Sequence, residues 1–190
     1  MHASRSGFTL LELTVVLMVI VVLAAMTFPA LTGTQGEYRV QAAADTVKGA
    51  WASARTYAME HGRAYRFAIV PGKGNYRIAP DSPTYWSGGG SPSGEEGELA
   101  TIVEATLPTG CLFSPPETLV DSSSITDDSS LPLEGVSPES WVTLAVFLPD
   151  GTAREDAQIL VQARAARAIL LELRSLTGAV TARPFKGENR

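Results

Sequence analysis

Cysteine and histidine are scarce in this 190-residue chain. Cys111 is its one cysteine, so no disulfide can form within the chain and the fold must rest on its hydrophobic core. The histidines are His2 and His61, which leaves few candidates for a general base. A cysteine nucleophile needs a histidine partner, so we interpret Cys111 as a small buried apolar residue.

The chain also lacks the short motifs that carry catalysis or cofactor binding. It has no GxSxG, P-loop, HExxH or CxxC sequence, and the glycines at 88–90 neither follow a predicted strand nor open a helix. The acidic, serine-rich segment 121–130 lacks the regular ligand spacing and the closing glutamate of a calcium loop, so a solvated loop is favoured over a metal site. We therefore expect no enzymatic activity and no cofactor.

An excess of positive charge is lacking too. The chain has 20 acidic and 15 basic residues and a formal net charge of −5. This balance argues against a nucleic-acid coat protein or a polybasic lipid-surface protein. It leaves room for a local basic patch, for which the candidate cations are Arg164, Arg167, Arg183, Lys186 and Arg190.

What the chain does have is a long apolar stretch at its start. Residues 8–28 would span roughly 32 Å as a helix, about the thickness of a bilayer core. The stretch follows a cation, Arg5, contains a single acid, Glu12, and ends at Pro29. We expect a transmembrane helix over residues 8–29, with its amino end in the cytoplasm because Arg5 precedes it. A carboxylate in hydrocarbon is costly, so Glu12 is a candidate functional residue.

Residues 7–13, GFTLLEL, resemble the type IV prepilin signature that type IV pilins and type II secretion pseudopilins share. The resemblance implies that a membrane-bound prepilin peptidase cuts on the cytoplasmic side after Gly7 and that Phe8 becomes the N-methylated amino terminus. It also implies that Glu12 acts in filament assembly and that Pro29 stands at position 22 of the mature chain. An ordinary signal anchor, the alternative, accounts for neither Glu12 nor the sequence at the Gly7–Phe8 boundary.

Elementary electrostatics supports an assembly role for Glu12. Cleavage would leave an α-ammonium on Phe8 with no partner in its own helix, because Glu12 lies one turn further along. When such helices stack with an axial stagger, Glu12 of one subunit can meet the ammonium of its neighbour. Each charge alone in lipid costs several kcal/mol, whereas a pair costs much less. The expected partners of this helix are therefore other pilins or pseudopilins.

A second, amphipathic helical segment is predicted over residues 30–62, where apolar residues recur every three or four positions. Gly62 suits the residue that ends a helix. We expect one helix over residues 8–61, weakened or melted at 31–36, where two glycines and two threonines fall. The residues predicted to face the core are Val40, either Ala43 or Ala44, Val47, Trp51, Ala54 and Ala58.

From residue 63 to residue 190 the sequence predicts an antiparallel β domain. The expected elements are a hairpin at 64–79, short strands at 102–107 and 111–113, and a meander of strands at 141–148, 156–163, 168–173 and 179–183. Two polar loops, 80–98 and 121–139, interrupt this domain. Within the first loop, Tyr85 and Trp86 are expected to pack down as an anchor rather than to form a contact surface.

This layout is α+β, with a long amino-terminal helix packed on an antiparallel sheet, and it is the pilin-like architecture. Segments 50–65, 146–151 (VFLPDG) and 176–180 (LTGAV) look like those of the minor pseudopilin H and FimT-like family, whereas residues 80–140 do not match its pattern. The resemblance implies a minor pseudopilin of a type II secretion pseudopilus. Such a protein is anchored in the bacterial inner membrane, and its periplasmic head contacts other minor pseudopilins or an exported substrate. The alternative is a minor type IV pilin that supports pilus assembly or contacts DNA during uptake.

Overall fold

A computed structural model of the protein describes residues 9–86, 101–116, 125–126 and 136–185, and leaves aside the side chains of 25–34. The chain divides into two compact units, residues 1–35 and residues 36–190. We call the second unit the head.

One long helix, α1 (Leu10–His61), begins in the first unit and ends in the head. It stops before Gly62, whose φ of +62° is a left-handed conformation that glycine adopts without strain. The predicted helix over residues 8–61 is therefore confirmed to within two residues at each end. Of the two alternatives at 31–36, a weak helix and a melted segment, the melted segment is wrong, because α1 includes these residues. Each glycine destabilises a helix by only about 1 kcal/mol. A long helix forms cooperatively and can include two such residues.

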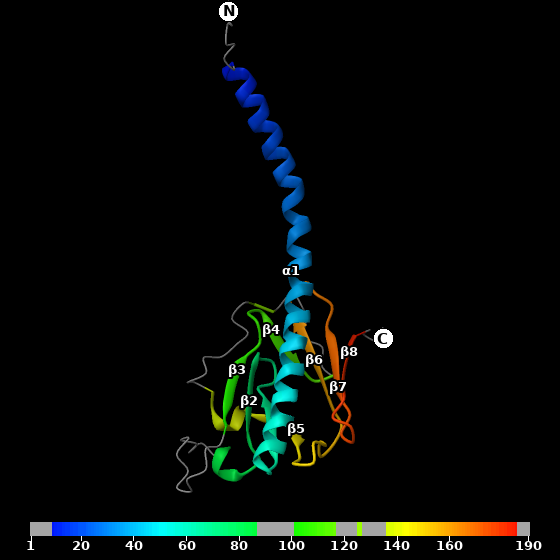
Figure 1. Cartoon of the computed structure of the whole chain (residues 1–190). Coiled ribbons are helices and arrows are strands. Elements are labelled where there is room, and N and C mark those ends of the chain that lie inside the picture. Colours follow the sequence, from blue (N-terminus) through cyan, green and yellow to red (C-terminus); the bar gives the residue numbers. More distant parts are fainter. Residues whose placement is uncertain (1–8, 87–100, 117–124, 127–135, 186–190) are drawn as a thin grey trace, which may run out of the picture. The chain divides into compact units, whose positions relative to one another are not determined.

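The head contains two four-stranded antiparallel sheets rather than the single sheet expected (Figure 1). The first sheet has the order β3-β2-β1-β5 and consists of β1 (Tyr65–Ile69), β2 (Asn75–Pro80), β3 (Val103–Thr106) and β5 (Val142–Phe147). The second has the order β4-β6-β7-β8 and consists of β4 (Cys111–Ser114), β6 (Ala157–Ala163), β7 (Ile169–Leu173) and β8 (Val180–Pro184). Two short 3-10 helices, η1 (Pro83–Tyr85) and η3 (Pro138–Ser140), complete the described elements.

Strand pairing confirms the predicted hairpin and corrects the predicted meander. Strands β1 and β2 pair with Phe67 opposite Ile78. The meander holds for β6, β7 and β8 only, because β5 pairs with β1 and places Ala145 opposite Phe67. After β5, a turn at Gly151 and a bridge between Phe147 and Ala153 lead the chain from the first sheet to the second. The alternation of apolar and polar residues predicts a strand but does not specify the strand with which it pairs.

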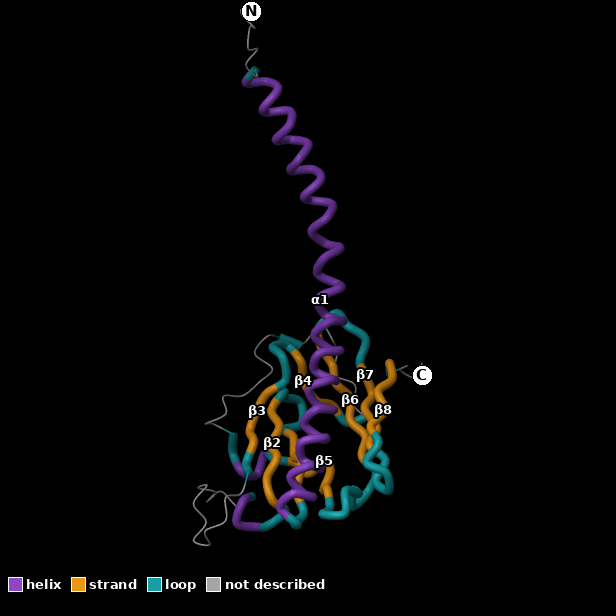
Figure 2. The backbone as a smooth tube through the Cα atoms, in the orientation of Figure 1, coloured by secondary structure: helices purple, strands orange, loops and turns teal. Residues whose placement is uncertain are grey.

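A single hydrophobic core joins the head part of α1 to both sheets. Figure 2 shows this part of the helix lying in front of the strands. Trp51 is only 1% exposed, and its ring meets the ring of Phe67 edge-on, with the centroids 6.0 Å apart. The predicted inner face of the helix is confirmed at all of its positions, which are Val40, Ala43, Ala44, Val47, Trp51, Ala54 and Ala58.

Trp86 packs against the first sheet, as predicted. It is half-buried, its indole N–H donates to the carbonyl oxygen of Pro80 at 2.8 Å, and the guanidinium carbons of Arg66 and Arg77 lie 4.8 and 5.1 Å from its ring. Tyr85 is half-buried in η1. The rest of the predicted loop 80–98 lies outside the described residues.

Most of the second predicted loop, 121–139, also falls outside the described residues. Ile125 is an exception and is 2% exposed, so this part of the chain reaches the core. The possible calcium site at 121–130 is therefore not tested, although the described residues contain no group of three acidic, histidine or cysteine side chains placed to hold a metal.

Candidate functional site

The amino-terminal part of α1 exposes apolar side chains over its whole circumference. Every large apolar side chain from Leu10 to Leu23 is between 48% and 81% exposed. These side chains occupy nearly consecutive positions, so at 3.6 residues per turn they cover all sides of the helix. A helix that is apolar all round is stable when lipid or other apolar helices surround it.

Within the described part of the chain, no helix combines the length and the apolarity needed to cross a membrane. The transmembrane segment expected over residues 8–29 is therefore not confirmed and stays a prediction. Pro29 lies inside α1 and does not begin a new helix.

Thr9 fixes the start of the helix and the position of Glu12. The backbone N–H of Glu12 donates to Oγ1 of Thr9 at 3.2 Å, and the N–H of Leu13 donates to the Thr9 carbonyl oxygen at 3.2 Å. Thr9 is thus the N-cap of α1, and Glu12 is the third helical residue. A threonine followed by a glutamate three residues later is the sequence signature of a capping box, which our interpretation of the sequence missed.

Glu12 lies in the first turn of α1, where the helix dipole favours a negative charge. Its side chain is exposed, and it makes no ion pair with any other described residue. In the sequence it is also the one ionisable residue between Arg5 and Glu37. Its carboxylate is therefore placed to meet a cation from outside this helix. The predicted processing residues, Gly7 and Phe8, lie outside the described residues.

Cys111, the candidate nucleophile, is buried in β4. Burial raises the pKa of the Cys111 thiol to about 11, and the charge of Arg39 lowers it by less. A thiol with such a pKa is a poor nucleophile, so the interpretation of Cys111 as a buried apolar residue is confirmed. His61 ends α1, with its Nδ1 2.9 Å from the carbonyl oxygen of Tyr57.

The candidate cations for a nucleic-acid surface are only partly described. Arg183 on β8 donates to Oε1 of Glu172 on β7 at 2.9 Å, so its charge is balanced within the sheet. Arg164 and Arg167 are exposed in the turn between β6 and β7. Lys186 and Arg190 lie outside the described residues.

Comparison with known families identifies the amino-terminal motif. Residues 2–28 match the family described as the prokaryotic N-terminal methylation motif. The match includes Gly7, Phe8 and Glu12 and ends one residue before Pro29. No curated protein and no solved structure matches the chain. The prepilin-type methylation motif, followed by a helix and an α+β head of antiparallel sheets, supports a type IV pilin-like protein.

Proposed function

We propose that this protein is a minor pseudopilin, a structural component of a type II secretion pseudopilus. The observation that carries the proposal is the methylation motif at the start of a helix that is apolar on all sides apart from a single acid. In this proposal a prepilin peptidase removes residues 1–7, Phe8 is methylated, and the helix leaves the inner membrane to pack among the helices of other subunits. The head faces the periplasm.

The exposed apolar surface and the position of Glu12 support assembly through the helix. An isolated subunit leaves the side chains of residues 10–23 without apolar neighbours, which is unfavourable in water. Lipid before assembly and neighbouring helices after assembly both cover this surface. The Glu12 carboxylate then selects one axial register, because pairing with the amino terminus of a neighbour removes two unpaired charges.

The choice of a minor pseudopilin within the type IV pilin-like proteins rests on three segments of the head. Segments 50–65, 146–151 and 176–180 resemble the minor pseudopilin H and FimT-like family. In the structure the last two segments contain the turns at Gly151 and Gly178. Both glycines lie so close to Arg55 of the first segment that a β-carbon on either would be within 3.2 Å of its side chain. The three segments thus meet at one place in the head.

A processing experiment tests the proposal. The full-length chain is produced with and without a prepilin peptidase, and its intact mass and amino-terminal sequence are determined. We expect a mature chain that begins at Phe8 and is one methyl group heavier than the unmodified polypeptide. Gly7→Val should retain residues 1–7, whereas the neighbouring variant Ser6→Ala should be processed normally. An intact leader on the wild-type chain in the presence of the peptidase would falsify the proposal.

A cellular experiment separates the pseudopilus from the alternative, a minor type IV pilin. Deletion of the gene should abolish export of proteins across the outer membrane and leave surface pili and DNA uptake unchanged. The DNA-contacting alternative is favoured by the exposed pair Arg164 and Arg167, and it predicts salt-dependent binding of duplex DNA. Loss of pili or DNA uptake with normal export would assign the chain to the pilus instead.

A further inference from the structure

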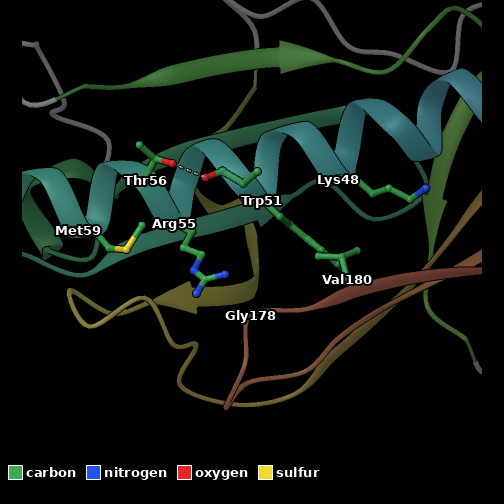
Figure 3. Close-up of a pocket in the computed structure, with 8 residues that line it drawn as sticks. Lys48, Trp51, Arg55, Thr56, Met59, Gly178 and Val180 are labelled. Atoms are coloured by element: carbon green, nitrogen blue, oxygen red, sulfur yellow. Dashed lines mark hydrogen bonds between the residues drawn. The ribbon is translucent and has the colours of Figure 1, made fainter.

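Arg55, on the head part of α1, lies against two glycine turns. A β-carbon on Gly178 would be 2.8 Å from Nη1 of Arg55, and one on Gly151 would be 3.2 Å from its Nε. Both glycines have a positive φ, 64° and 82°. Figure 3 shows the Arg55 side chain extending from the helix toward the Gly178 turn. Both turns therefore approach the guanidinium at positions that carry no side chain.

The guanidinium of Arg55 has no acceptor among the described residues. Its Nε is buried without a hydrogen-bond partner, and it forms no ion pair with a described acid. A guanidinium group carries five N–H donors, and a buried donor that is left unpaired destabilises the folded protein. Other arginines of the head do pair with acids; these are Arg66, Arg77, Arg154, Arg174 and Arg183.

A second unpaired donor lies one helical turn away. The indole N–H of Trp51 is buried and has no acceptor among the described residues, whereas the indole N–H of Trp86 donates to the Pro80 carbonyl oxygen at 2.8 Å. Buried tryptophan N–H groups usually find a partner. Trp51 and Arg55 thus place two unsatisfied donors on consecutive turns of the same helix.

Both residues line one cavity of about 290 Å³, which we call the Arg55 niche. Lys48 also lines it, with its Nζ 3.0 Å from Oδ1 of Asp45, while Met59 and Val180 supply apolar surface. None of the described residues that line the niche is acidic. The niche is therefore lined by two cationic side chains, Arg55 and Lys48, beside an apolar wall, and none of its described lining residues carries a negative charge.

We propose that the Arg55 niche binds a carboxylate, presented by an acidic side chain of a neighbouring protein subunit. A carboxylate fits because its two oxygens match the fork of a guanidinium and can accept two parallel hydrogen bonds. The apolar wall of Met59 and Val180 suits the methylene groups that carry such a carboxylate in a protein. The neighbouring subunit as the source rests on the proposed function, whereas the carboxylate chemistry does not.

The indole N–H of Trp51, a residue that lines the niche, is the reporter for this binding. The full-length chain in detergent micelles, labelled with ¹⁵N at tryptophan, gives one indole signal for each of Trp51, Trp86 and Trp141. The probes are a short peptide with blocked ends and a single glutamate, the same peptide with glutamine, acetate, and inorganic phosphate. We expect the glutamate peptide to shift the Trp51 signal in a saturable manner and to leave Trp86 unchanged. The glutamine peptide should shift neither signal.

Two variants connect the shift to the niche. Arg55→Gln should weaken binding of the glutamate peptide at least tenfold, whereas Arg174→Gln, which removes an exposed guanidinium that is paired with Asp156, should not change it. If Arg55→Gln fails to fold, Val180→Glu provides the second test. It places a carboxylate on the wall of the niche, where it should pair with Arg55 and abolish the response to the peptide.

The outcomes that overturn the inference are distinct from failure of the proposed function, which the processing of Gly7 decides. A Trp51 signal that does not respond to the glutamate peptide overturns the proposal that the niche binds a carboxylate. This is the result expected if water satisfies the N–H donors of Trp51 and Arg55. A response of equal size to the glutamine peptide, or to phosphate alone, overturns the proposal that the niche is selective for a carboxylate. If acetate binds as tightly as the glutamate peptide, the proposal that the carboxylate belongs to a protein side chain is overturned.

Discussion

Gly36 of α1 lies so close to Arg164 that a β-carbon at position 36 would be 2.6 Å from the Arg164 carbonyl oxygen. The same β-carbon would be 3.2 Å from Cβ of Ala166. The turn between β6 and β7 therefore packs directly on the helix backbone where the head begins. Glycine inside a helix costs about 0.5–1 kcal/mol relative to alanine, and here this close packing requires it.

Replacement of Gly36 by alanine should therefore destabilise the head. Backbone atoms on both sides have to move apart to admit the methyl group, which costs about 1–3 kcal/mol. Urea unfolding of the full-length chain in detergent, followed by tryptophan fluorescence, measures this change. Gly49→Ala is the matched control, because nothing lies within 4 Å of its β-carbon position. This control should stabilise the head by up to about 1 kcal/mol. Equal effects of the two variants would contradict the packing role of Gly36.

The sequence predicted the helix and most of its buried face because the apolar residues that are buried recur with the period of the helix. At residues 31–36 the low helix propensity left a melted segment open as an alternative, which the structure does not contain. Propensity describes the isolated helix, whereas the contact between Gly36 and the Arg164–Ala166 turn is tertiary. The strands were likewise found by alternation, but the pairing of β5 with β1 depends on residues about 75 positions apart.

The two candidate sites differ in how far the sequence reveals them. The methylation motif is continuous, so the sequence alone predicts Gly7, Phe8 and Glu12 as its functional residues. The Arg55 niche cannot, because it forms only when Arg55 meets turns at Gly151 and Gly178. The amphipathic pattern identifies Trp51 as a core residue but says nothing about whether its N–H has a partner.

Asp81 should make the stability of the head depend on pH. Its side chain is only 9% exposed, and it accepts hydrogen bonds from Nε of Arg66 at 2.8 Å and from Nη2 of Arg154 at 2.8 Å. Burial pushes the pKa of this carboxyl upward, but the hydrogen bonds and charges of the two arginines outweigh it, so the pKa is lowered. A lowered pKa in the folded state means that the ionised carboxylate stabilises the head at neutral pH. This contribution is lost as the pH falls through the folded pKa.

Asp81→Asn should therefore be less stable than the wild type by about 1–3 kcal/mol at pH 7, because it leaves two arginines without their anion. The difference should shrink as the pH falls below about 4, where the unfolded carboxyl also becomes protonated. Urea unfolding at a series of pH values measures it. Asp45→Asn, which removes an exposed partner of Lys48, should have a much smaller effect. A difference between Asp81→Asn and wild type that is independent of pH would show that the charge of Asp81 is not responsible.

Cys111 should react slowly in the folded chain. It is fully buried in β4, and burial raises its pKa to about 11. Because the thiolate is the reactive form, this pKa alone should slow alkylation by about a hundredfold at neutral pH. The measurement is the rate of iodoacetamide incorporation by intact mass, with the chain in urea as the control. Gly36→Ala should increase the rate, because it populates the unfolded state. Alkylation of the folded wild type at the rate found in urea would contradict burial of this thiol.

Glu12 should be needed for assembly and not for processing. Glu12→Leu removes the carboxylate that we propose pairs with the amino terminus of a neighbouring subunit. The neighbour's ammonium is then left unpaired in an apolar environment. Co-purification with assembled filament components should therefore fall about tenfold or more. Thr9→Val separates this role from helix capping, because it removes the acceptor of the Glu12 N–H and keeps the carboxylate. Glu37→Gln, an exposed acid further along the helix, is the control for loss of charge. Normal assembly of Glu12→Leu together with failure of Thr9→Val would mean that this end of the helix acts through its cap and not through an intersubunit ion pair.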